Sequence, residues 1–181
     1  MRVIAIPDPS LVVLVGAAGS GKSTFAARHF AADEVLSSDA YRALLSGDEA
    51  DQRRTRTAFS ILHREVVRRL AAGQLVVVDA TNVEHHARRA LRERADAAGV
   101  PAIAIVLALP PGVVHARNGA RTERIVNSSV VERHLARLAV ALGDSGITSE
   151  GFEAVHVLGS VEEIDDAVIQ RRRRGDEPIK R

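Results

Sequence analysis

The stretch that most constrains the fold of this chain is Gly16-Ala17-Ala18-Gly19-Ser20-Gly21-Lys22-Ser23-Thr24. It follows the apolar run 11–15 and precedes Phe25-Ala26-Ala27-Arg28, a segment typical of a helix. This is the pattern G-x-x-x-x-G-K-[ST] between a strand and a helix, and the context distinguishes a phosphate-binding loop from an ordinary glycine-rich turn. The sequence therefore predicts a strand, a phosphate-binding loop and a helix in direct succession.

Each residue type in this loop contributes to phosphate binding. Glycines let the backbone curl so that its N–H groups point inward, and the helix N-terminus adds a partial positive charge. Lys22 brings a full positive charge to the β- and γ-phosphates, and the Ser23 hydroxyl suits Mg²⁺, which prefers oxygen ligands. We therefore expect a nucleoside triphosphate such as ATP, with Mg²⁺, to bind at Gly16, Gly19, Ser20, Gly21, Lys22, Ser23 and Thr24.

The order of apolar runs predicts an α/β fold with a parallel five-stranded sheet flanked by helices. The expected strands cover about 11–15, 34–37, 75–78, 102–109 and 155–158, with helices between them. The strands are apolar throughout, as in parallel sheets that are covered on both faces. Residues 1–10 are expected to be irregular, and 161–171 to form a last helix before a charged tail over 171–181. No repeat or linker divides the chain, so we expect a single domain.

Composition narrows the possible functions. The chain has 181 residues, no cysteine and a formal net charge of +2. A disulfide framework and a cysteine-based zinc site are therefore excluded, and the bulk charge is weak evidence for a nucleic-acid partner. No apolar run reaches membrane-spanning length, and the N-terminus lacks the pattern of a signal peptide, so the expected location is the cytoplasm. The seven histidines form no metal-binding pattern.

Two aspartates follow predicted strands and should lie near the bound phosphates. Asp39 could accept the proton of an attacking hydroxyl, or it could cap the next helix, as Ser37 or Ser38 could. Asp79 follows Val76-Val77-Val78, where a carboxylate commonly binds the Mg²⁺ waters or the loop serine. It could also cap the helix that follows, for which residues 81–84 resemble a capping box.

Three arginines come from the predicted helical segment 112–142. Arg117, Arg121 and Arg124 are spaced i, i+4 and i+7, which places them on one helix face. Such a segment could close over the nucleotide as a lid, its arginines neutralising charge on the transferred phosphoryl group. The alternative is a solvated basic face balanced by Glu123 and Glu132, and the pattern alone slightly favours this alternative.

Several stretches together resemble the polynucleotide 5′-kinase domain of bacterial RNA-repair enzymes that join kinase, phosphatase and ligase activities. The matching stretches are Gly16–Phe25, Val35–Asp39, Asp48–Asp51, Val76–Asn82, Arg117-Asn118, Arg121-Thr122 and Glu150-Gly151-Phe152. They run over nearly the whole chain in the family's order and spacing. The repair enzymes carry phosphatase and ligase regions in addition, and this chain matches their kinase domain.

The resemblance implies a P-loop kinase fold with a helical lid over about 112–142. It also implies that Lys22 and Ser23 hold phosphates and Mg²⁺, and that Asp39 is the general base for the acceptor's 5′-OH. Arg42 would hold the acceptor's phosphate, and Arg117 and Arg121 would clamp the donor phosphates. On this basis the chain is expected to be an ATP-dependent kinase of RNA or DNA 5′-OH ends.

Two other functions remain open at this point. A P-loop kinase for a small-molecule hydroxyl, such as a sugar, nucleoside or antibiotic, would share the loop, the base and the lid. A nucleotide-dependent switch or adaptor would need no acceptor base, and Asp39 followed by Arg42 argues against it.

Overall fold

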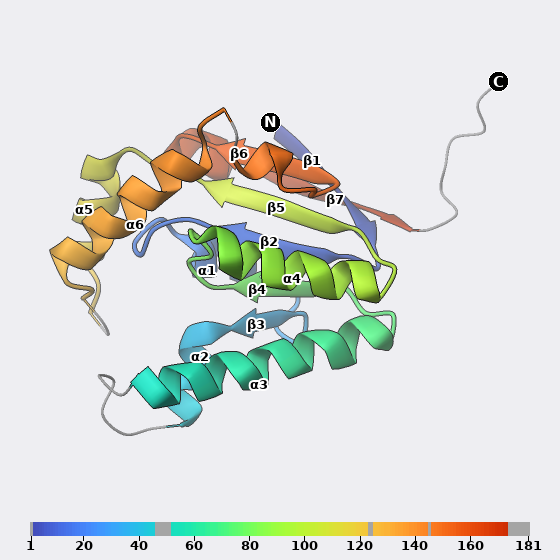
Figure 1. Ribbon diagram of the computed structural model, residues 1–181. Helices are drawn as coiled ribbons and strands as arrows, with labels where there is room; N and C mark the ends of the chain where they lie inside the picture. Colours follow the sequence, from blue (N-terminus) through green and yellow to red (C-terminus); the bar gives the residue numbers. More distant parts are fainter. Residues whose placement is uncertain (1, 46–51, 123–124, 145, 174–181) are drawn as a thin grey trace.

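The computed structural model describes residues 2–45, 52–122, 125–144 and 146–173. A five-stranded parallel sheet in the order β3-β4-β2-β5-β6 lies at its centre (Figure 1). The strands are β2 (Leu11–Val15), β3 (Val35–Ser37), β4 (Val76–Asp79), β5 (Ala102–Leu107) and β6 (Ala154–Leu158). Every pairing in this sheet is parallel, so the predicted α/β architecture is confirmed.

Helices connect the strands and lie against both faces of the sheet. They are α1 (Lys22–His29), α2 (Ser38–Leu44), α3 (Gln52–Ala71), α4 (His85–Ala97), α5 (Pro111–Gly119), α6 (Ser128–Ala141) and α7 (Val161–Asp165), with a 3₁₀ turn η1 (Ile147–Ser149). Most predicted boundaries agree with these to within about three residues. The two-part helical segment over 112–142 corresponds to α5 and α6.

The core consists of two apolar layers because alternate residues of each strand face opposite sides of the sheet. Leu11, Val13 and Val15 of β2 pack with α3 and α4 on one side. Val12 and Leu14 pack with α1 on the other. Strand β2 is therefore packed on both faces up to the point where the phosphate loop begins.

The two ends of the described chain were predicted wrongly. Residues 1–10 contain the strand β1 (Arg2–Asp8), and α7 ends at Asp165 rather than about 171. The next strand, β7 (Ala167–Arg173), pairs in parallel with β1 from Arg2↔Ala167 to Asp8↔Arg173. Arg171 also donates to both carboxylate oxygens of Glu34, each at 2.6 Å. Its backbone therefore belongs to a sheet rather than to a charged tail; residues 174–181 lie outside the described residues.

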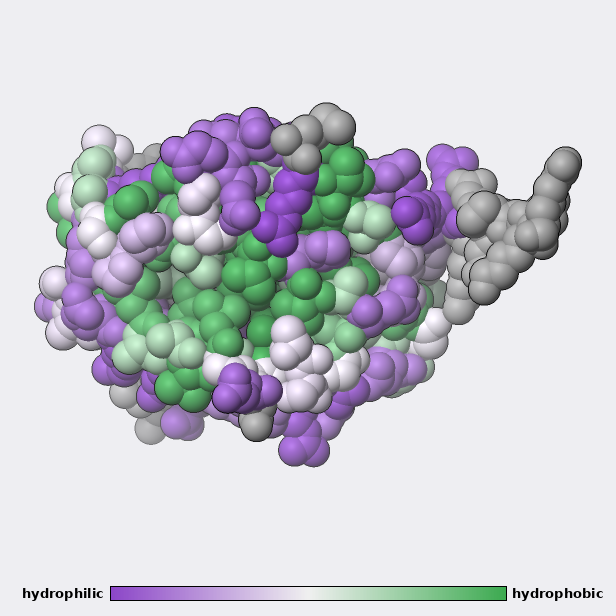
Figure 2. All heavy atoms as spheres, turned by 90° about the horizontal axis from the view of Figure 1, so that it is seen from above, coloured by the Kyte–Doolittle hydropathy of each residue, from purple (hydrophilic) through white to green (hydrophobic). Residues whose placement is uncertain are grey.

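This second sheet covers apolar surface beside α1. Ile4 and Ile6 of β1 are fully buried in the same layer as Phe25. Strand β6 forms one edge of the main sheet, and four of its five residues are only half-buried. Figure 2 shows apolar side chains across the middle of the face on the β6 and α6 side, with polar side chains around its margins.

Candidate active site

The phosphate loop joins β2 to α1 at the carboxyl edge of the main sheet. Gly19 and Gly21 have φ values of 89° and 93°, in the left-handed region that favours glycine. A Cβ atom on Gly19 would lie only 2.7 Å from the Val114 carbonyl oxygen of α5, and one on Gly21 would lie 3.3 Å from Arg117 Nη1. Glycine is therefore required both for the turn and for the close approach of α5.

The Lys22 side chain is buried under the loop. Its Nζ donates to the carbonyl oxygens of Gly16 at 2.9 Å and Ala17 at 2.8 Å, and to Ser20 Oγ at 3.4 Å. Burial lowers the pKa of Lys22 to about 8, although the Asp79 and Asp39 carboxylates act to raise it. The loop thus holds a desolvated cation whose charge would be stabilised by phosphate oxygens.

Ser23 and Asp79 meet beside Lys22. The Ser23 hydroxyl donates to Asp79 Oδ2 at 2.7 Å, and Asp79 ends β4 with only 6% of its surface exposed. A hydroxyl and a carboxylate at the mouth of a phosphate loop are the oxygen donors that suit Mg²⁺. This donor set fits the ion, and phosphate and water oxygens would complete its coordination.

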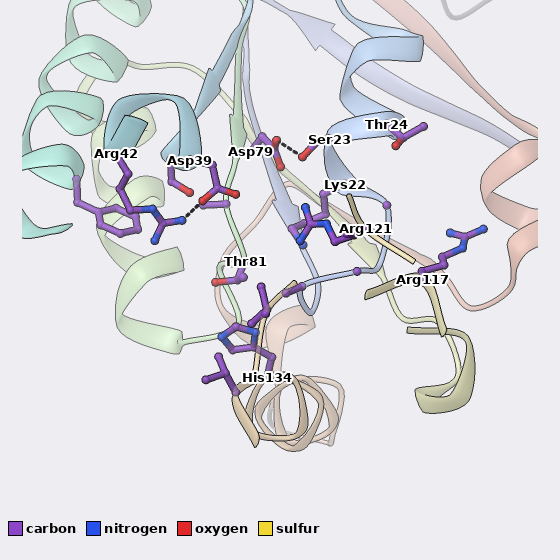
Figure 3. Close-up of a pocket in the computed structure, with 18 residues that line it drawn as sticks. Lys22, Ser23, Thr24, Asp39, Arg42, Asp79, Thr81, Arg117, Arg121 and His134 are labelled. Carbon is purple, nitrogen blue, oxygen red and sulfur yellow. Dashed lines mark hydrogen bonds and ion pairs between the residues drawn. The ribbon is translucent and has the colours of Figure 1, made fainter. Parts of the chain in front are cut away.

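Asp39 and Arg42 lie one helical turn apart on α2 and form an ion pair. Both line the same pocket as Lys22 and Ser23, and Figure 3 shows them on the opposite wall from α1. The helix cap proposed as an alternative role for Asp39 is provided by Ser37, whose Oγ accepts from Ala40 N at 3.4 Å. The Asp39 carboxylate is 54% exposed, so it lies within reach of an incoming substrate.

Arg117 and Arg121 of the predicted lid do not lie on one helix. Helix α5 ends at Gly119, so Arg117 belongs to its last turn and Arg121 to the segment after it. Arg124 lies outside the described residues, as does the matched stretch Asp48–Asp51. Arg117 and Arg121 still both line the pocket. Asn118, which is buried, donates to Val126 O at 2.7 Å and accepts from Val126 N at 3.2 Å, which ties the last turn of α5 to the residue before the Asn127 cap of α6.

The predicted capping box over 81–84 is also wrong. Helix α4 starts at His85 without a side-chain cap, and Asn82 adopts a φ of 47°. The Asn82 amide instead donates to Leu14 O at 2.8 Å, and Gly16 N donates to Thr81 O at 2.9 Å. These residues fasten the end of β4 to the phosphate loop, a long-range contact that a local pattern cannot indicate.

Arg88 supports this turn from behind. Its Nη1 donates to the carbonyl oxygens of Asn82 and Val83 at 2.9 and 2.7 Å. The rest of its guanidinium binds Glu150, with Nε to Oε2 at 2.7 Å. Arg88 is only 2% exposed, so its ion pair with Glu150 is buried. These contacts link α4, the turn after β4 and the segment before β6.

A family model described as an AAA domain matches residues 11–142, from β2 through α6. That range includes the loop, Asp39, Asp79 and the arginines of the pocket. The chain belongs to the AAA domain family. A search among curated proteins finds no match.

Solved structures with the fold of this AAA domain include several kinases. A chain of the Pnkp1/Rnl/Hen1 RNA repair complex matches with a TM-score of 0.64 and 24% identity, over 75% of this chain and 45% of that one. A sugar kinase from Janibacter sp. HTCC2649 matches with a TM-score of 0.58 and 23% identity, over 83% of this chain and 85% of that one. A gluconokinase from Sinorhizobium meliloti 1021 matches with a TM-score of 0.54 and 20% identity, over 88% and 87%.

These likenesses show that the AAA domain has the P-loop kinase fold, and the resemblance to the RNA-repair kinase is confirmed at that level. The chain spans 45% of the length of its RNA-repair neighbour. None of the helices in the described ranges combines the length and apolar character needed to cross a membrane.

The pocket also contains residues that the sequence patterns missed. Phe59 of α3, Thr81 and the α6 residues Val130 and His134 complete its wall (Figure 3). Thr81 belongs to the matched stretch Val76–Asn82, although no role was predicted for it in the pocket. Phe59, Val130 and His134 belong to no local motif, and they come together because α3 and α6 pack around the carboxyl edge of the sheet. His134 is part of no metal-binding pattern and of none of the matched stretches, so no signal in the sequence pointed to it.

Proposed function

We propose that this protein is an ATP-dependent kinase that transfers the γ-phosphoryl group to the 5′-OH end of RNA or DNA. The observation that carries the proposal is that one pocket holds both a donor side and an acceptor side. The donor side is formed by the phosphate loop, Lys22, Arg117 and Arg121, and the acceptor side by Asp39 and Arg42. The RNA-repair neighbour and the resemblance in the sequence support a polynucleotide as acceptor.

In this proposal the acceptor oxygen attacks the γ-phosphorus while the bond to the β-phosphate oxygen breaks and ADP leaves. Asp39 accepts the hydroxyl proton, and Arg42 orients Asp39 and binds the acceptor's phosphate. Lys22, Arg117 and Arg121 stabilise the charge that spreads over the transferred group. Mg²⁺, held through Ser23 and Asp79, would neutralise charge on the donor phosphates.

A second candidate is a kinase for a small-molecule hydroxyl. The sugar kinase and gluconokinase neighbours, each matched over most of both chains, favour it specifically. It would use the same loop, base and arginines, and would differ in what Arg42 and Phe59 contact.

One assay separates these functions. The protein is incubated with γ-labelled ATP, Mg²⁺ and a 5′-OH oligonucleotide, and transfer to the oligonucleotide end is measured. End-labelling is expected, and an oligonucleotide that already carries a 5′-phosphate serves as the control. Transfer only to sugars or nucleosides would support the second candidate, and ATP binding without transfer to any acceptor would support a nucleotide switch.

A further inference from the structure

His134 lies in the active-site pocket, yet the mechanism above gives it no role. It lies on α6 between Val131 and Leu138, which are both buried and anchor the helix. Arg137, three residues after His134 on α6, forms an ion pair with Glu84, the residue before α4. Figure 3 shows the His134 ring projecting from α6 toward Thr81. The ring is therefore held at the pocket wall by a fixed helix.

The His134 ring carries a buried polar atom without a partner. Its Nδ1 is inaccessible and makes no hydrogen bond, although nearly all buried polar groups in proteins are paired. Among the described residues, His29, His63 and His156 also have such a nitrogen, but only His134 lines the pocket. The other three histidines do not line the pocket, so their pKa values should not respond to a ligand bound there.

The charges around His134 set its protonation state. Burial lowers the pKa of His134, and the Lys22 ammonium and the Arg133 guanidinium lower it further. Other charged groups facing it across the pocket are Asp39 and Arg42 on α2, Asp79 on β4, and Arg117 and Arg121 at and after the end of α5. Without a ligand the ring is therefore mostly neutral near neutral pH. A triphosphate on the loop would reverse this balance, because its negative charge offsets Lys22 and favours an imidazolium.

We propose that His134 binds the phosphate groups held at the loop as an imidazolium, so that nucleotide binding is coupled to uptake of a proton by its ring. The proton comes from solvent, and the imidazolium donates a hydrogen bond to a phosphate oxygen from Nε2, because Nδ1 is inaccessible. The inference rests on the proposed function only in that a nucleoside triphosphate binds at the loop. It is independent of which acceptor the kinase uses.

Calorimetry with the non-hydrolysable analogue AMPPNP and Mg²⁺ tests this coupling. Titrations at about pH 6.5 in buffers of different ionisation enthalpy give the number of protons taken up, at a pH where Lys22 is already charged because its pKa is about 8. The wild-type protein should take up more protons than His134→Gln, which keeps a hydrogen-bond donor but cannot ionise. The affinity of the wild-type protein should fall by up to about tenfold from pH 6 to pH 8, with a smaller fall in His134→Gln.

His85→Gln is the matched control, because His85 is an exposed histidine at the start of α4 outside the pocket. It should behave as the wild type. NMR titration of the histidine rings in the wild-type protein avoids any question of variant folding. The pKa of His134 should be higher with AMPPNP–Mg²⁺ than without it, whereas that of His156 should not change.

The possible outcomes are distinguishable. If the wild-type protein binds AMPPNP–Mg²⁺ but His134→Gln takes up the same number of protons, or the His134 pKa does not rise, the inference is overturned and the kinase proposal stands. If the wild-type protein does not bind AMPPNP–Mg²⁺ at all, both are overturned. Loss of the extra proton uptake only in His134→Gln supports the inference.

Discussion

At the scale of single residues, the structure distinguishes between the two roles that the sequence left open for Asp39 and Asp79, a role in the site and a helix cap. Ser37 caps α2, so the Asp39 carboxylate is not needed for that task and pairs with Arg42 in the pocket. Asp79 accepts from Ser23 at 2.7 Å, and α4 begins six residues later without a side-chain cap. Both contacts are consistent with the proposed roles of these aspartates in catalysis and Mg²⁺ binding.

Asp39→Asn should lower kcat by about 10²–10⁴-fold, because an amide cannot accept the acceptor's proton. AMPPNP affinity should change little, since Asp39 lies on the acceptor side. End-labelling rates and calorimetry measure the two effects. Asp165→Asn is the matched control, because Asp165 also pairs with an arginine, at 3.0 Å, and is 56% exposed compared with 54% for Asp39. Turnover by Asp39→Asn near the wild-type rate would remove Asp39 as the base.

At the scale of elements, the segment from α5 to α6 brings basic groups to the phosphate loop by packing rather than by helical spacing. Val114 and Asn118 of α5 lie against Gly19, so a Cβ there would be 2.7 Å from Val114 O and 3.2 Å from Asn118 N. Arg117 and Arg121 therefore reach the pocket from the end of the helix and from the loop after it.

Arg117→Ala and Arg121→Ala should each lower kcat/KM by about 10²-fold or more, because each removes a positive charge from the transferred phosphoryl group. The matched control is Arg89→Ala, since Arg89 pairs with Glu93 at 2.8 Å on an exposed face of α4. End-labelling at several ATP concentrations measures the effect. Values of kcat/KM close to the wild type in both variants would contradict the lid proposal.

The buried pair of Arg88 and Glu150 should matter for stability. Arg88→Met leaves the Glu150 carboxylate buried without its partner, and the free energy of unfolding should fall by about 3–5 kcal/mol. The double variant Arg88→Met, Glu150→Leu should recover much of this loss because no charge is left unpaired. Urea denaturation of the wild type, both single variants and the double variant measures the coupling. A loss of unfolding free energy in the double variant equal to the sum of the losses in the two single variants would contradict this coupling.

At the scale of the whole molecule, folding buries the Lys22 ammonium under the phosphate loop, and the loss of its hydration lowers the free energy of unfolding. Burial lowers the Lys22 pKa from 10.5 in the unfolded chain to about 8. Between these values the unfolded state binds more protons than the folded state, so stability rises with pH in that range. Below about pH 8 both states are protonated, and the folded protein carries the full penalty of the buried charge.

The difference in unfolding free energy between the wild type and Lys22→Met should therefore change with pH. From about pH 7 to about pH 9.5 the wild type should gain about 2 kcal/mol relative to the variant. Urea denaturation of both proteins without nucleotide, at the two pH values, measures this gain. An unchanged difference would show that Lys22 has a pKa near its ordinary value in the folded protein.

The sequence by itself determined the main sheet, the helix order and the loop Gly16–Thr24, because each depends on local apolar runs, glycine spacing or helical periodicity. It did not determine β1 and β7, since these strands exist only by pairing with each other across more than 150 residues. It placed Arg121 near the phosphates, but through a helical spacing that α5 does not continue, and it did not indicate the bond from Asn82 to Leu14 O or the place of His134 in the pocket. Those depend on where α5 ends and on how α4 and α6 pack at the carboxyl edge of the sheet, and only the tertiary structure decides such long-range contacts.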